Sequence, residues 1–175
     1  MRKLAVHKSV IAIGFISLFL VSCGGGGGGG IVGAANISLT VEPRSLDTGD
    51  HAQVDVEISE VNDDGIALKI KYPKGLSYFP DSAFLDVGDN RRNLTPTNNV
   101  TVDDDIYLVF YLSKSWFGDG NHGTLTLQLV AEDSVPNGTV QVDADVNDPA
   151  VSDATEFDSH NPAFTEQYEV DVEVS

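Results

Sequence analysis

The chain of 175 residues has the length of about one domain, and its 27 acidic residues against 10 Lys and Arg give a formal net charge of -17. This balance argues against nucleic acid as a partner, because contacts with phosphates need a basic face. The single cysteine excludes an intramolecular disulfide and a metal site built from several thiolates.

Residues 1–22 have the pattern of a secretory signal peptide. Three basic residues within the first eight precede an apolar run at residues 10–21, which is shorter than the about 20 apolar residues of a membrane helix. Leu20-Val21-Ser22-Cys23 follows and resembles the lipobox of bacterial lipoproteins. The resemblance implies cleavage before Cys23 and lipidation of its thiol. The alternative is an ordinary secreted protein with one free thiol near the cleavage site.

Residues 23–36 are then expected to form the lipidated cysteine and a glycine-rich tether. Residues 24–30 are seven consecutive glycines, which can bury no side chain and keep maximal backbone freedom. Acyl chains on Cys23 would hold the protein on a lipid bilayer without crossing it. The positions after the cysteine lack the aspartate that signals inner-membrane retention in lipoproteins of Gram-negative bacteria. The expected location is the cell envelope, with the outer membrane favoured if the organism is Gram-negative.

Residues 37–175 show the period of two that half-buried strands produce. Alternating apolar positions predict six strands, at 37–41, 52–58, 66–72, 125–131, 140–146 and 168–174. The more continuously apolar segment 106–112 predicts a strand buried on both faces or at the edge of the core. Turn formers such as Pro136-Asn137-Gly138 separate the runs, and no window has a helical period. We predict an all-β, immunoglobulin-like antiparallel sandwich of about seven to nine strands.

Several turn motifs in this region resemble those of a known family. They are Gly49-Asp50, Tyr72-Pro73-Lys74-Gly75-Leu76-Ser77-Tyr78, Gly123-Thr124-Leu125-Thr126-Leu127 and Asp158-Ser159-His160-Asn161-Pro162-Ala163. The set resembles the immunoglobulin-like bacterial surface repeats catalogued as domain of unknown function eleven, and residues 81–102 depart from that pattern. A weaker resemblance, to cohesin-like sandwiches, rests on Gly49-Asp50 and on Gly65-Ile66-Ala67-Leu68 before Tyr72-Pro73. Both resemblances imply a surface interaction domain.

Catalytic motifs are absent from the sequence. It contains no nucleophile elbow, zinc-binding histidine pair, phosphate-binding loop or dinucleotide fingerprint. The three histidines after the leader, His51, His122 and His160, each lie beside turn residues, where they are expected to be solvated. We therefore predict that the protein is not an enzyme, and we assign no catalytic residue.

Acidic residues suggest calcium as the candidate cofactor. The candidate metal ligands lie in and after the strand predicted at 140–146, at Asp143, Asp145, Asn147, Asp148, Asp153 and Asp158. The spacing departs from an EF-hand, because Asp148 stands where the sharp-turn glycine belongs and Ala154 where the bidentate glutamate belongs. A hard cation among these oxygens would relieve their repulsion. The alternative is an acidic surface screened by water and salt.

Trp116 and Phe117 are the candidate partner-binding residues, since aromatic rings beside a glycine-rich turn can anchor a protein or stack on a sugar. The alternative is that one or both rings close one end of the core. The leading hypothesis is a membrane-anchored envelope lipoprotein whose non-enzymatic sandwich binds an envelope or extracellular protein or glycan. The second hypothesis is a calcium-dependent, cohesin-like carbohydrate- or protein-binding module.

Overall fold

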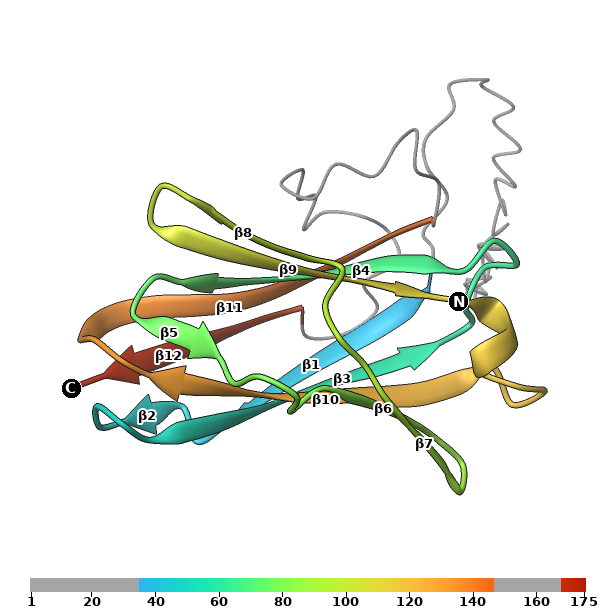
Figure 1. The fold of residues 1–175 in the computed structure, drawn as a ribbon, viewed down its shortest axis with the longest axis horizontal. Coiled ribbons are helices and arrows are strands. Elements are labelled where there is room, and N and C mark those ends of the chain that lie inside the picture. The colour runs from blue at the N-terminus through green and yellow to red at the C-terminus, as the bar shows by residue number, and fades with distance from the viewer. Residues whose placement is uncertain (1–34, 147–167) are drawn as a thin grey trace, which may run out of the picture.

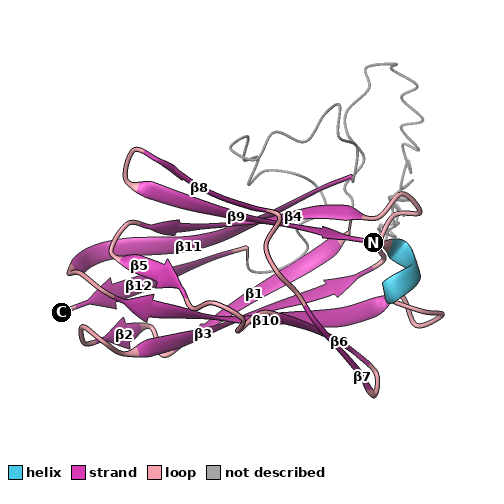
Figure 2. Cartoon of the chain, in the orientation of Figure 1, coloured by secondary structure: helices cyan, strands magenta, loops and turns pink. Residues whose placement is uncertain are grey.

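The structure is a computed structural model that describes residues 35–146 and 168–175. Strands make up most of these residues, and the one helix among them is the three-residue 3₁₀ helix η1, Lys114–Trp116 (Figure 2). The strands form two sheets that lie face to face (Figure 1). No helix in the described ranges is long and apolar enough to span a bilayer.

The first sheet, called sheet A, has the strand order β1-β3-β10-β6-β7, with β5 also paired to β10. Its strands are β1 (Asn36–Glu42), β3 (His51–Ser59), β5 (Leu76–Tyr78), β6 (Phe84–Val87), β7 (Asn90–Asn93) and β10 (His122–Ala131). All of their pairings are antiparallel. β10 lies at the centre of this sheet, and the hairpin of β6 and β7 forms one edge.

The second sheet, called sheet B, has the strand order β2-β12-β11-β4-β9-β8. Its strands are β2 (Ser45–Leu46), β4 (Ile66–Pro73), β8 (Asn98–Val102), β9 (Asp105–Leu112), β11 (Val135–Val146) and β12 (Glu169–Val174). The short β2 pairs with β12 in parallel, and the other pairings are antiparallel.

The core lies between the two sheets, and the sequence period of two creates it. On β1 the side chains of Ile37, Leu39 and Val41 are at most 1% exposed, while Thr40 between them is exposed. Sheet B contributes the facing layer in the same way through alternate residues of β4, β9 and β11. Burying each such aliphatic side chain contributes about 1.5–3 kcal/mol before the loss of chain entropy is counted.

The predicted fold class is confirmed, because the described residues form an immunoglobulin-like β-sandwich that contains all seven expected strands. The strand count is higher than expected, with twelve in the described ranges. The extra strands are β2, β5, β6, β7 and β8, each of two to five residues. Among the described residues Ala35 is buried and β1 begins at Asn36, while the predicted domain boundaries stay a prediction.

The predicted turn at Pro136-Asn137-Gly138 is wrong, because these residues lie inside β11. The register of β11 against β12 shifts between Val135 and Gly138, which marks a β-bulge. A proline has no N–H for the ladder and is tolerated in a strand at such a bulge. A Cβ on Gly138 would lie 2.6 Å from Val135 Cγ1 and 2.8 Å from Pro73 Cγ, so the bulge needs glycine for close packing. The turn-forming residues therefore bend a strand here and do not end it.

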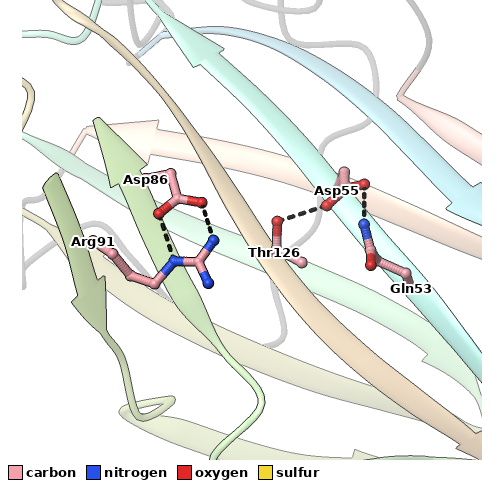
Figure 3. Close-up of polar contacts among 5 residues, drawn as sticks. All are labelled: Gln53, Asp55, Asp86, Arg91 and Thr126. Atoms are coloured by element: carbon pink, nitrogen blue, oxygen red, sulfur yellow. Dashed lines mark hydrogen bonds and ion pairs between the residues drawn. The ribbon is translucent and has the colours of Figure 1, made fainter. Parts of the chain in front are cut away.

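Polar side chains on the outer face of sheet A bond to one another across strands (Figure 3). Asp55 on β3 accepts a hydrogen bond of 2.7 Å from Gln53 Nε2 and one of 2.6 Å from Thr126 Oγ1 on β10. Bonds of this kind restrict the rotamers of the side chains that make them. This outer face is therefore polar and ordered, in contrast to the apolar inner face.

Candidate binding cleft at one end of the sandwich

The structure separates the two aromatic residues that the sequence places together. Phe117 is 1% exposed and belongs to the core, so its prediction as a partner-binding residue is wrong. Trp116 is partly exposed and packs against the edge of the core. Two backbone hydrogen bonds of η1 set this division, from Trp116 N–H to the Ser113 carbonyl at 3.0 Å and from Phe117 N–H to the Lys114 carbonyl at 3.1 Å.

The hairpin of β6 and β7 provides the other wall of the candidate site. It projects from the edge of sheet A beyond the body of the sandwich (Figure 1). In its register Leu85 pairs with Arg92, and Asp86 pairs with Arg91. Directly paired residues of an antiparallel ladder share a face, and Leu85 faces the core. Arg92 is therefore on the inner side of the hairpin and Arg91 on the outer side.

Arg91 is held in place on the outer side of the hairpin. Its Nε and one terminal nitrogen donate hydrogen bonds of 2.8 and 2.7 Å to the two oxygens of Asp86 (Figure 3). Its guanidinium also lies 3.8 Å from the centroid of the Phe84 ring. The hydrogen bonds to Arg91 hold the pKa of the Asp86 carboxyl below its ordinary value, and Asp86 raises the pKa of Arg91. The positive charge of Arg91 is thus compensated within the hairpin.

Arg92 has a different environment on the inner side. Its guanidinium carbon lies 4.5 Å from the centroid of the Trp116 ring, which is a cation–π contact between the hairpin and η1. Within residues 35–146 and 168–175 the Arg92 guanidinium makes no recorded hydrogen bond or ion pair, and the side chain is exposed. Its N–H groups are therefore available to a ligand.

A cleft of about 570 Å³ lies between the inner side of the hairpin and η1. We call it the end cleft. The residues that line it are Leu85, Val87, Asn90, Arg91, Arg92, Ser115, Trp116 and Gly118. The volume lies within the roughly 300–1,000 Å³ typical of small-molecule sites. The end cleft combines an aromatic ring, a guanidinium without an anionic partner and polar side chains, which together suit a ligand with both a hydrophobic face and an anionic group.

A second hollow, of about 640 Å³, lies on the outer face of sheet A and has no aromatic ring in its lining. Its lining is Thr40, Glu42, Pro43, Arg44, Gln53 and Asp55. The lining carries one arginine, Arg44, and two carboxylates, those of Glu42 and Asp55. Asp55 already accepts two hydrogen bonds from neighbouring side chains. The end cleft is the better candidate for a binding site.

The structure locates one side chain of the predicted calcium site. Asp143 is 1% exposed and lies within β11, where its Oδ2 is 3.8 Å from Lys69 Nζ. Asp145 lies on the same strand, while Asn147, Asp148, Asp153 and Asp158 fall outside the described residues. In the described ranges no group of three or more His, Cys, Asp or Glu side chains could hold a metal ion. Asp143 therefore pairs with a lysine, and the rest of the calcium prediction stays a prediction.

Sequence reasoning did not single out Arg92. One signal could have found it, because Arg91-Arg92 is the only pair of adjacent basic residues after residue 3 of this acidic chain. The partnership with Trp116 could not be found in the same way, since 24 positions in sequence separate the two residues.

No family model matches the sequence, and no curated protein matches it. The resemblance to the bacterial surface repeats therefore stays a prediction. One similar solved structure is AvmM, which catalyses macrocyclization in alchivemycin A biosynthesis, at 10% identity and TM-score 0.46, covering 81% of this chain and 88% of that chain. Another is the N-terminal domain of the Streptococcus gordonii adhesin Sgo0707, at 10% identity and TM-score 0.48, covering 80% of this chain and 32% of that chain.

A third is a cohesin module from a family 33 glycoside hydrolase of Clostridium perfringens, at 14% identity and TM-score 0.36. This match covers 81% of the chain and 97% of the cohesin module. The chain thus spans about a third of the adhesin structure and nearly all of the cohesin module. Similarity of this degree assigns no activity or partner to the chain.

Proposed function

We propose that the protein is a lipid-anchored, non-enzymatic interaction module of the bacterial cell envelope, and that it binds its partner through the end cleft. The observation that carries the binding role is the contact of Arg92 with Trp116, in which a guanidinium that has no anionic partner among the described residues lies over a partly exposed indole. Aromatic and arginine side chains are the types most enriched among residues that dominate binding energy.

The position of the end cleft supports this role. Its walls belong to a projecting hairpin and to η1, while the core of the sandwich fixes both through Leu85 and Phe117. Sites supported by a packed scaffold bind with less loss of conformational freedom than sites on loose loops. The two walls of the end cleft are thus each anchored in the core.

The sequence before the sandwich supports the anchor. Cleavage before Cys23 and acylation of its thiol would leave residues 24–30 as a flexible glycine tether between the bilayer and the sandwich. Such a tether holds a strongly acidic body away from anionic lipid, whose field decays within a Debye length of about 8 Å.

The anchor is tested with the full chain expressed in a bacterium that is fed an alkyne-labelled fatty acid. We expect the label on the wild-type chain and its loss from Cys23→Ala, which should also leave the membrane fraction. The matched control is Phe79→Ala, which removes an exposed ring far from the leader. Equal labelling of wild type and Cys23→Ala would contradict the anchor.

The binding role is tested by adhesion of cells that display the full chain to surfaces coated with envelope or extracellular proteins and glycans. We expect binding that the double variant Arg92→Gln/Trp116→Ala loses and that Arg44→Gln/Phe79→Ala keeps. The control variant removes the same chemical groups, an exposed arginine and an exposed ring, from elsewhere on the surface. Unchanged adhesion of the end-cleft variant would refute the role of this cleft, and a robust hydrolase activity that one substitution abolishes would refute the non-enzymatic function.

The second hypothesis, a calcium-dependent carbohydrate- or protein-binding module, is tested separately. A thermal melt in excess calcium and then in chelator reports a bound ion, since a ligand at 100 times its dissociation constant stabilises the native state by about 2.7 kcal/mol. An upward shift of several degrees in calcium would favour this hypothesis. Identical melts in calcium and chelator would leave the interaction module without a metal.

A further inference from the structure

We propose that the ligand of the end cleft is a carboxylate-bearing sugar, of the uronic acid class, within a glycan whose carboxylates are spaced apart. This inference rests on the proposed binding role of the same cleft and names the chemistry that it recognises.

The two adjacent arginines of the hairpin have different roles. Arg91 makes a two-point ion pair with Asp86, at 2.8 and 2.7 Å, and so already binds a carboxylate of its own chain. Arg92 has no such partner in the described part of the chain and lies 4.5 Å from the Trp116 ring. A guanidinium presents its N–H groups as a planar fork that matches a carboxylate. The same pairing seen at Arg91 is therefore available at Arg92 to a ligand.

Trp116 supplies the second element of recognition. Its ring packs against the core on one part and borders the end cleft with another. The Arg92 guanidinium lies over this ring, so the indole offers a pyranose only the part of its apolar surface that borders the end cleft. An indole surface next to a guanidinium suits a ligand that has an apolar surface next to an anion. A uronic acid has both within one sugar unit.

The remaining lining favours a sugar over a peptide. Asn90 and Ser115 are exposed, and both carry groups that donate and accept hydrogen bonds with hydroxyls. Leu85, by contrast, is 1% exposed and offers almost no apolar surface to a ligand. Peptide anchors are usually buried in well-packed, fully desolvated pockets. The end cleft has one aromatic ring in a polar surround, which suits a hydroxylated ligand.

The net charge sets a limit on the charge density of the ligand. A formal charge of -17 repels any dense polyanion over the distance of a Debye length, about 8 Å at physiological salt. A single carboxylate that contacts Arg92 gains a local ion pair, while widely spaced carboxylates keep the repulsion small. A glycan with one carboxylate for every two sugar units meets both conditions, and a nucleic acid or a heavily sulfated chain does not.

The test uses an oligosaccharide of alternating glucuronate and N-acetylglucosamine units, titrated into the folded protein by calorimetry and by NMR of the Trp116 indole. The matched ligand is the same oligosaccharide with each carboxyl reduced to a primary alcohol. We expect binding of the acid form, at least tenfold weaker binding of the reduced form, and a loss of affinity with rising salt. Equal binding of the two forms would overturn the inference.

Variants of the chain complete the test. Arg92→Gln should weaken binding of the acid form by about 10- to 100-fold and leave binding of the reduced form unchanged. Arg92→Lys, which keeps the charge without the fork, should recover only part of the loss. Arg44→Gln is the control and should bind as the wild type does. If Arg92→Gln and Arg92→Lys weaken binding of the acid form and of the reduced form equally, Arg92 has a structural role and the inference is overturned.

The failure of this inference is distinguishable from failure of the proposed function. Two results combined would overturn the ligand class and leave the binding role standing. These are cell adhesion that depends on Arg92 and Trp116, and equal binding of the acid and reduced oligosaccharides. Binding of a glutamate-rich peptide in preference to the sugar would overturn the ligand class in favour of a protein partner. Adhesion that is unchanged in the variant Arg92→Gln/Trp116→Ala would refute the binding role itself.

Discussion

Lys69 on β4 and Asp143 on β11 are directly opposed residues of sheet B, with Nζ and Oδ2 3.8 Å apart and exposed fractions of 0% and 1%. The period of two places both on the outer face of the sheet, because Leu68 and Ile70 on either side of Lys69 belong to the core. The alternation of apolar and polar residues in the sequence predicts correctly that Lys69 lies on this face. It does not predict that two charged groups on the face away from the core are buried.

This pair should be strongly coupled in stability. Removing one partner takes a compensating charge away from a buried charged group, so we expect Lys69→Met and Asp143→Leu each to lower the free energy of unfolding by about 3–5 kcal/mol. The double variant should lose far less than the sum of the two. Urea unfolding of the four proteins measures the coupling. Additive losses would show that the two groups do not interact.

The matched control for this cycle is the ion pair of Lys71 and Asp105, with N and O atoms 3.1 Å apart. These side chains are 25% and 37% exposed, and so solvent screens their attraction. We expect Lys71→Met to cost no more than about 1 kcal/mol. A cost equal to that of Lys69→Met would mean that burial is not the cause of the larger effect.

A glycine that packs against a neighbouring strand should tolerate no side chain. Gly65 precedes β4 with φ at +84°, and a Cβ there would collide with the carbonyl oxygen of Leu112. We expect Gly65→Ala to destabilise the fold by about 3 kcal/mol or more, from left-handed backbone strain and from overlap with backbone atoms. Gly88→Ala is the control, since Gly88 has φ at +55° and nothing within 4 Å of its Cβ position. It should cost about 1–2 kcal/mol by denaturant unfolding.

The sequence predicts the seven long strands because each has at least three apolar residues at alternate positions, as Ile37, Leu39 and Val41 show. It does not predict β7, whose four residues are all polar and exposed, because pairing with β6 alone makes this segment a strand. The sequence does not predict the bulge at Pro136, for a related reason. Turn-forming residues have the same local preferences whether the partner strand continues beside them or not.

The candidate site was only half predictable from the sequence. An aromatic residue beside a glycine-rich turn marks Trp116, but no local pattern reveals that Phe117 turns into the core. Arg92 faces Trp116 only because Leu85 pairs with Arg92 in the hairpin and faces inward. This register depends on tertiary pairing, and a shift by one residue would place Arg91 on the inner side.

The pairing of Asp86 with Arg91 should be visible in the pH dependence of the hairpin. Hydrogen bonds from Arg91 lower the pKa of the Asp86 carboxyl from its ordinary value of about 4. A lowered folded-state pKa means that the pair stabilises the fold above the ordinary pKa, and that this stabilisation is lost as the pH falls through the folded-state value. NMR titration of the Asp86 carboxyl carbon measures it. We expect Arg91→Gln to return the pKa toward 4, and an unchanged midpoint would contradict the pairing.

Substitution of Phe117 should mainly lower stability, whereas substitution of its neighbour Trp116 should mainly weaken binding. Phe117→Ala removes a ring that is 1% exposed, so we expect a loss of about 3–5 kcal/mol in the free energy of unfolding. Trp116→Ala removes a partly exposed ring and should cost about 1–2 kcal/mol, because less apolar surface returns to water. Binding at the end cleft should show the opposite order once both variants are compared under conditions where they remain folded. Thermal melts and ligand titrations on the same samples measure both effects, and a Trp116→Ala variant that unfolds as readily as Phe117→Ala would place the indole in the core instead of the cleft wall.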